Sequence, residues 1–175
     1  MMLTQKEFSV QDVAAATGTQ PRNISDWVSR GYILGNFEEG KHRRFSFSNV
    51  MEIALCVAAM QRFGFTPERA FRLAAIFAYI GEGGAGWIGE EDTTPERHPG
   101  APFHYSEGFT FVVAQGDHSE VVLSKDGKID MTGFPPDYLD TVGLLVLNVS
   151  AIFMNVCARL GQDHRLVLDG IYGEA

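Results

Sequence analysis

Cationic and amide side chains gather in the first quarter of the chain, in types that suit contact with nucleic acid. A basic run occupies residues 41–44, and lysine and arginine bind the phosphates of the DNA backbone through their charge. Earlier in the chain, Arg22 and Asn23 have the side-chain types that pair bidentately with guanine and adenine. We therefore predict a DNA interface here. Its candidate residues are Gln20, Arg22, Asn23, Ser25, Asp26, Lys41, His42, Arg43 and Arg44.

Two short helices joined by a tight turn would position the first of these residues. Ser9 can cap a helix over residues 10–16, and Gly18 supplies the backbone conformation that the turn needs. Pro21 suits the first position of a second helix. The apolar side chains that repeat on one face of this helix are Ile24, Trp27 and Val28. This pattern predicts a helix-turn-helix, whose second helix enters the major groove, although a helical hairpin in any small domain fits it as well.

The residues after the second helix predict a wing. Gly31 ends the helix, residues 32–34 form a short apolar strand, residues 35–40 turn, and the basic run leads into residues 45–47. A β-ribbon with a cationic tip beside a recognition helix places its charges on the phosphates that flank the groove. A solvated charged face is the alternative for such a run.

The order of these motifs resembles the MerR family of winged-helix transcription regulators over about residues 8–78. The shared features are Val10 to Ala16, Gly18, Pro21, Gly31-Tyr32-Ile33-Leu34, Arg43-Arg44-Phe45-Ser46, Asn49-Val50 and the hinge Gly64-Phe65-Thr66-Pro67-Glu68. The resemblance implies double-stranded DNA binding and transcription regulation. It also implies that residues 47–63 and 67–80 are two helices around this hinge.

Two features depart from the family pattern. The second helix has Ser25-Asp26-Trp27-Val28 where members have an arginine followed by an aromatic pair and a glutamate. The helix after the hinge ends at Ile80, whereas members continue into a long coiled coil that pairs two subunits. Divergent winged modules of this kind also resemble phage excisionases and small terminase subunits. An architectural protein of a phage or mobile element is therefore the alternative function within this fold.

Charge is divided unequally along the chain. The 175 residues carry a net charge of −8, but residues 1–80 contain nine Lys and Arg against seven Asp and Glu, whereas the remainder contains five against fifteen. A polyanion would therefore bind the first half of the chain. A protein-interaction module with an acidic second half is a further alternative function. The chain has no apolar run of membrane-spanning length, no secretory signal and only two distant cysteines, which predicts a cytoplasmic protein without a membrane partner.

The second half predicts a small α+β domain. Residues 81–102 are rich in Gly, Pro and acidic side chains and are interpreted as a linker between a domain at 1–80 and one at 103–175. Turn dipeptides separate three strand-like segments, at 109–115, 118–124 and 128–131, which form a β-meander. A long apolar helix over residues 137–160 follows. The predicted fold class is α+β, with an N-terminal winged helix-turn-helix domain, this meander and the long apolar helix.

The residues of the predicted long helix are apolar on nearly all sides, so the helix needs cover on both faces. A second copy of the same helix is the favoured cover, which predicts a homodimer through residues 137–160 and two recognition helices about one DNA turn apart. The alternative is that the wing domain or the linker folds over the helix within one chain.

The sequence predicts no enzyme, cofactor or metal site. Its cysteine and histidine residues are scattered, and hydrolytic candidates such as His118 with Glu120, or Asp163-His164 with Ser124, lie in no recognisable motif. A small-molecule or protein effector is a further prediction. The aromatic residues that could line its pocket are Phe103, Tyr105, Phe109 and Phe111, although aromatics on a sheet also form the core.

Overall fold

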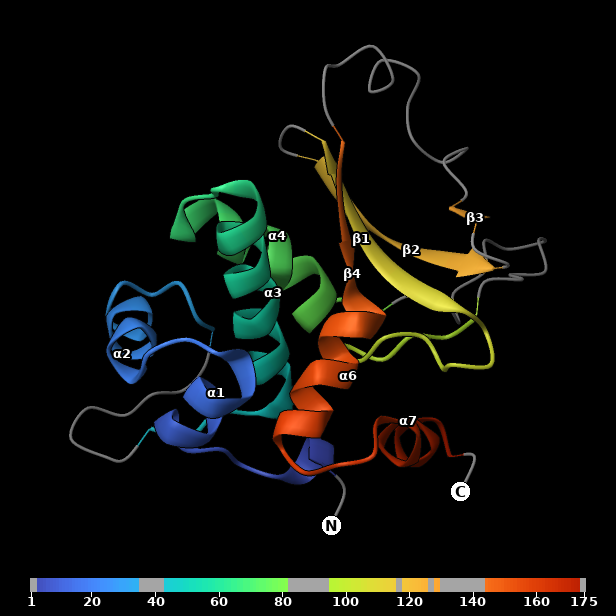
Figure 1. Ribbon diagram of the computed structural model, residues 1–175, viewed down its shortest axis with the longest axis horizontal. Coiled ribbons are helices and arrows are strands. Elements are labelled where there is room, and N and C mark those ends of the chain that lie inside the picture. The colour runs from blue at the N-terminus through green and yellow to red at the C-terminus, as the bar shows by residue number, and fades with distance from the viewer. Residues whose placement is uncertain are drawn as a thin grey trace.

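The computed structural model describes residues 3–34, 43–81, 95–115, 118–125, 128–129 and 144–173. Its helices are η1 (Leu3–Gln5), α1 (Val10–Thr17), α2 (Pro21–Ser29), α3 (Phe47–Phe63), α4 (Pro67–Tyr79), α6 (Val149–Arg159) and α7 (His164–Tyr172). Its strands are β1 (Phe109–Gln115), β2 (His118–Lys125), β3 (Lys128–Ile129) and β4 (Leu145–Asn148). Figure 1 shows α1 and α2 on one side of the molecule and the sheet on the other, with α3 and α6 between them. The predicted mixture of helices and strands is confirmed.

Local capping chemistry explains the N-terminal helices. Ser9 and Asp12 form a reciprocal capping box at the start of α1, because the Ser9 hydroxyl accepts from the Asp12 amide at 3.2 Å and the Asp12 carboxylate accepts from the Ser9 amide at 2.9 Å. Gly18 ends α1 at φ 74°, in the left-handed region that glycine tolerates. Ser46 and Asn49 repeat the capping box at α3. The helix-turn-helix and the two helices around the hinge lie where the sequence predicts them.

The strand predicted at residues 32–34 is wrong. The Tyr32 ring instead stacks on Phe71 of α4, with 5.9 Å between ring centroids, and the Tyr32 amide donates to the Trp27 carbonyl at the end of α2. Phe45 pairs with Phe8 as an isolated antiparallel bridge, closed by two backbone hydrogen bonds of 2.9 Å. Tertiary packing on α4 thus holds residues 32–34 in an irregular conformation. The predicted turn and the start of the basic run, residues 35–42, lie outside the described residues.

The sheet is antiparallel, with strand order β3-β2-β1-β4. The predicted strands at 109–115 and 118–124 are confirmed, and the third forms over Lys128–Ile129, with Asp130 and Met131 outside the described residues. The continuous helix predicted over 137–160 is wrong from Leu145 to Asn148, which form β4 against β1. Burial alternates along β4, since Leu145 and Leu147 are buried while Val146 and Asn148 are exposed. Asn148 then caps α6 by accepting from the Ala151 amide at 2.9 Å.

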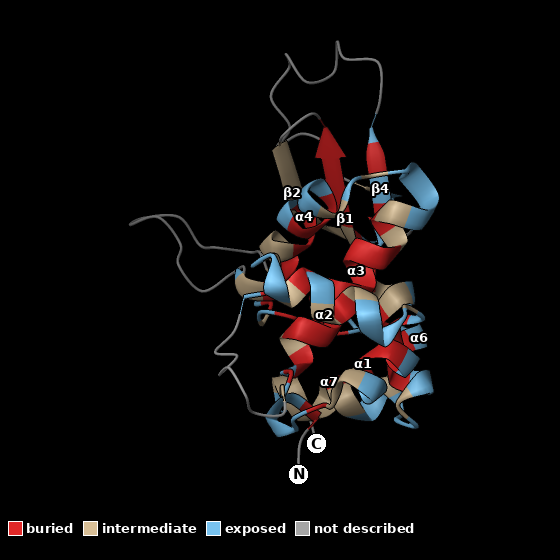
Figure 2. Cartoon of the chain, turned by 90° about the vertical axis from the view of Figure 1, so that its left-hand side faces the viewer, coloured by how far each residue is buried: buried red, intermediate tan, exposed pale blue. Residues whose placement is uncertain are grey.

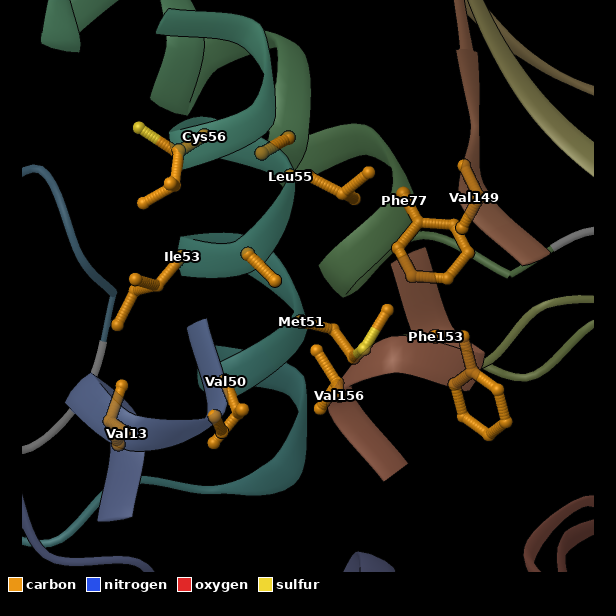
Figure 3. Packing of buried hydrophobic residues seen from close by; sticks show 14 of the residues in the cluster. Val13, Val50, Met51, Ile53, Leu55, Cys56, Phe77, Val149, Phe153 and Val156 are labelled. Carbon is orange, nitrogen blue, oxygen red and sulfur yellow. The ribbon is translucent and has the colours of Figure 1, made fainter. Parts of the chain in front are cut away.

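One hydrophobic cluster joins the two halves of the chain. Helix α3 lies at its centre, and Figure 2 shows this helix as buried along most of its visible surface. Figure 3 shows Phe77 of α4 directed toward Val149 of α6 and Met51 of α3 extending toward α6, and Phe153 and Val156 of α6 belong to the same buried cluster. The N-terminal helices of the same chain therefore cover the apolar face of α6, for which a second copy was predicted.

The described end of the predicted linker is packed rather than exposed. Arg97 is 1% exposed, and its guanidinium donates to the carbonyls of Phe77 at 3.1 Å, Ala101 at 3.0 Å and Ile80. Its cation also lies 4.7 Å from the centroid of the Phe77 ring. Because Phe77 and Ile80 are at the C-terminal end of α4, whose carbonyls lack partners within the helix, Arg97 caps that end. The division into domains at 1–80 and 103–175 stays a prediction.

Candidate nucleic-acid interface

The first turn of α2 presents polar side chains outward. Pro21 occupies the first helical position, and Gln20 before it is exposed and makes no side-chain cap to the helix. Arg22 is exposed, and Asn23 is half-buried, with its amide donating to the Thr19 hydroxyl at 3.3 Å. Ile24 and Trp27 anchor the opposite face in the core. Figure 2, in which α2 faces the viewer, shows that the helix lies on an open side of the molecule.

Ser25 and Asp26 both make contacts within α2. The Asp26 carboxylate forms an ion pair with Arg30 one turn later, at 3.0 Å, which offsets a negative charge on the surface of α2. Hydrogen bonding to Asp26 also raises the pKa of Arg30. Ser25 is half-buried, and its carbonyl accepts from the Ser29 hydroxyl at 2.8 Å.

Arg43 connects the predicted basic run to α2. Its guanidinium donates to the Ser25 carbonyl at 3.3 Å, across eighteen positions of sequence. Arg43 is half-buried, whereas Arg44 is exposed. The charge of Arg44 is among the causes that lower the pKa of Asp12, after the hydrogen bonds from Ser9. The structure thus brings Arg43 and Arg44 to the side of the molecule that carries α1 and α2, while Lys41 and His42 lie outside the described residues.

A buried polar network between α3 and α4 contacts Leu34, at the start of the predicted wing. The Tyr79 hydroxyl donates to the Glu52 carboxylate at 2.6 Å, and the Asn49 amide donates to the Tyr79 oxygen and to the Leu34 carbonyl, both at 2.8 Å. Glu52 is 1% exposed, and desolvation raises its pKa to about 7. Its second carboxylate oxygen is buried with no hydrogen-bond partner among the described residues. The network thus holds Leu34, the last described residue before the predicted turn, against α3 and α4.

Sequence reasoning missed this network, although one signal was present. Glu52 lies in the middle of an otherwise apolar stretch of α3 and is followed by Ile53, Ala54 and Leu55. A carboxylate in such a setting is either exposed or has a buried partner. The partner here comes from another helix, which local sequence patterns do not reveal.

The C-terminal half contacts the helix-turn-helix directly. Arg159, at the end of α6, donates to the Ala16 carbonyl near the end of α1 at 3.3 Å. Its guanidinium also lies so close to the turn that a β-carbon placed on Gly18 would be 2.9 Å from it. A cation at the C-terminal end of a helix is favourable because the last carbonyls carry partial negative charge. Arg159 therefore links α6 to the turn that sets the angle between α1 and α2.

Of the hydrolytic candidates, His118 and Glu120 form a close pair, whereas Ser124 makes no contact with Asp163 or His164 among the described residues. His118 contacts Glu120 at 2.8 Å, whereas Ser124 is buried in β2 and Asp163 caps α7. A different set lies close together: His104 contacts the Ser106 hydroxyl at 2.7 Å and the Asp169 carboxylate at 3.0 Å. The Ser106 backbone amide also donates, at 3.4 Å, to His104 Nδ1, the ring nitrogen that contacts the Ser106 hydroxyl. The His104 imidazole therefore joins the segment before β1 to α7. No group of side chains among the described residues could hold a metal ion.

Comparison with known families finds a match for the N-terminal part. Residues 8–75 match the family described as MerR HTH family regulatory protein. The matched segment runs from Phe8 into α4 and contains α1, α2 and α3, so the predicted MerR-like resemblance is confirmed for this part. The family is one of DNA-binding regulators rather than enzymes, and the match covers under half of the chain. A comparison with curated proteins found no match. Within the described ranges, no helix is long and apolar enough to cross a bilayer.

Proposed function

We propose that the protein is a sequence-specific double-stranded DNA-binding transcription regulator that acts as a homodimer. The observation that carries this proposal is the position of α2 inside the segment that matches a helix-turn-helix regulatory family. The first turn of this helix is outward, and its opposite face is fixed in the core by Ile24 and Trp27. A helix held in this way can present side chains to base edges without losing its orientation.

We assign base readout to the first turn of α2. Arg22 reads guanine and Asn23 reads adenine, with Gln20, Ser25 and Asp26 beside them at the groove. The phosphate contacts are assigned to Lys41, His42, Arg43 and Arg44. Because Arg43 is also bonded to the Ser25 carbonyl, it fixes the basic segment relative to α2, whereas exposed Arg44 is the better probe of phosphate contact.

The homodimer is proposed through residues 137–160. Apolar side chains of this region that remain exposed in a single chain support it: Leu144 is 46% exposed and Val146 36%. Strand β4 lies at the edge of the sheet, and an unpaired edge is a template for pairing with a second strand. Sedimentation of the full chain at micromolar concentration tests this proposal: a dimer supports it, and a monomer overturns it.

Selection of bound fragments from random double-stranded DNA tests the function. The proposal predicts one enriched motif with two-fold symmetry, whereas recovery of no common motif would overturn sequence-specific binding. The salt dependence of binding then tests the phosphate contact. Arg44→Ala should reduce the slope of log affinity against log salt by about 0.9 for each subunit bound. The matched control is Lys128→Ala, which removes one exposed positive charge on the sheet, at the other side of the molecule in Figure 1.

A further inference from the structure

A cavity of about 240 Å³ lies between the segment before β1, helix α6 and helix α7. Three of the four aromatic residues predicted for an effector pocket line it, namely Phe103, Tyr105 and Phe109, whereas Phe111 does not. Helix α6 contributes Ser150, Phe153 and Met154, and α7 contributes His164, Arg165 and Leu168. An engineered apolar cavity of about 150 Å³ binds benzene, so this cavity has room for one or two rings.

The mouth of the cavity retains apolar surface that folding has not buried. Tyr105 is 45% exposed, Phe109 54% and Met154 41%, and all three line the same cavity. Large apolar side chains that gather at the rim of a cavity mark a binding site for an apolar ligand, because isolated exposed residues would be scattered instead. The ligand therefore has an apolar, ring-sized body.

The charged lining indicates the polar part of the ligand. Arg165 lines the cavity, and its guanidinium lies 5.5 Å from the centroid of the Tyr105 ring. The described residues that line the cavity carry no carboxylate; the carboxylate of Asp169, which interacts with the Arg165 charge, lies outside the lining and is bonded to His104. The bond from His104 to Asp169 fixes the two walls relative to each other, since it ties the segment before β1 to α7. We propose that this cavity binds an aromatic carboxylate of one or two rings, with Arg165 at the carboxylate and Phe103, Phe109 and Phe153 around the rings.

The same helix that lines the cavity also contacts the DNA-binding half. Phe153 packs edge-on against Phe47, the first residue of α3, with 5.9 Å between ring centroids, and Phe47 lies 6.4 Å from Phe8. Farther along α6, Arg159 donates to the Ala16 carbonyl of α1. A ligand that shifts α6 therefore shifts contacts at the helix-turn-helix. The cavity thus couples the aromatic carboxylate to DNA affinity, and this coupling, unlike the ligand site itself, rests on the proposed function.

The ligand site is tested without DNA, with naphthalene-2-carboxylate as probe and naphthalene-2-carboxamide as its neutral counterpart. Titration calorimetry on the full chain should show that the carboxylate binds more tightly than the carboxamide. Arg165→Gln should remove that preference. Met154→Trp should fill the cavity and weaken both probes at least tenfold, whereas Asn155→Trp, at the next and exposed position of α6, should bind like wild type. No binding of the carboxylate up to about 1 mM, or equal binding to both tryptophan variants, would overturn the site.

The coupling is tested by the affinity for the selected DNA with and without saturating carboxylate. A linked site should change this affinity by about fivefold or more. Arg159→Met should reduce the change while leaving carboxylate binding intact, because Arg159 is outside the cavity. An unchanged DNA affinity in the wild type would overturn the coupling. A protein that binds no DNA would instead refute the proposed function, and the DNA-free titration would still decide the ligand site.

Discussion

Replacement of Glu52 by glutamine tests the energetic consequence of the buried network under the predicted wing. Burial raises the pKa of Glu52 from 4.5 to about 7, while the Tyr79 hydroxyl and Asn49 partly oppose the shift. The titratable neighbours are Tyr79 on α4 and Cys56 one turn along α3, and the Glu52 charge contributes to raising the pKa of each. Because the folded state holds this proton more tightly than the unfolded state, Glu52 imposes no penalty below about pH 4.5. The penalty grows as pH rises and is complete above about pH 7.

The magnitude follows from that interval. One pKa unit corresponds to about 1.4 kcal/mol, so the wild type should lose about 3 kcal/mol of unfolding free energy at this residue between pH 4.5 and 8. Glu52→Gln cannot ionise and should not show this loss. One end of the glutamine amide would occupy the buried position of the Glu52 oxygen that has no hydrogen-bond partner, so the variant should be less stable than wild type at pH 5. As pH rises, the stability of the variant should increase relative to that of wild type.

Urea unfolding at pH 5, 6, 7 and 8 measures the difference between variant and wild type, followed by circular dichroism and by tryptophan fluorescence, to which buried Trp27 contributes. In this difference, the contributions to the unfolding free energy from groups that titrate alike in both proteins cancel. Glu68→Gln, at an exposed carboxylate of α4, is the control and should follow the wild type. A difference between Glu52→Gln and wild type that stays constant with pH would refute the reasoning.

Two other substitutions test contacts between distant segments. Arg97→Met should lower the unfolding free energy by about 3 kcal/mol or more, because it leaves buried carbonyls at the end of α4 without a donor. Arg72→Met, on the exposed side of α4, is the control. Equal losses for the two variants in urea unfolding would show that Arg97 does not cap α4. Gly18→Ala should cost about 1 to 2 kcal/mol for its left-handed backbone, and more if Arg159 must leave Ala16. Gly31→Ala has a similar φ but open space around it, so equal losses in the two alanine variants would show that Arg159 contributes nothing at the turn.

Local chemistry made much of the N-terminal fold predictable. Ser9, Ser46 and Thr66 cap helices whose starts can be read from the sequence, and Gly18 and Gly64 end helices in the left-handed conformation. These signals act within one turn of a helix, so they hold whatever the rest of the chain does. The outward first turn of α2 follows directly from them.

The errors arose where long-range packing decides the structure. Residues 145–148 are apolar enough for either a strand or a helix, and the pairing of Val112 with Leu147 selects the strand. The cap at Asn148 marks the true start of α6, but within an apolar run it is a weak signal. Similarly, Tyr32 packs on Phe71 rather than joining a strand.

The contacts that join the two halves could not be predicted from local patterns. The bond from Arg159 to Ala16 spans 143 positions, and the bond from His104 to Asp169 spans 65. The cavity likewise draws its walls from three separate segments. Its aromatic residues were nevertheless indicated by composition, because Phe103, Tyr105 and Phe109 lie close together in sequence.

The central claim is that the first turn of α2 reads DNA sequence, and the affinity of Arg22→Ala for two kinds of DNA tests it most directly. Arg62→Ala, which removes an exposed cation from the last turn of α3, is the matched control. Base readout by Arg22 predicts a loss of about 1 to 3 kcal/mol on the selected site, little loss on random DNA, and no such difference for Arg62→Ala. An equal loss on both kinds of DNA, or no loss on either, would contradict the assignment of base recognition to this turn.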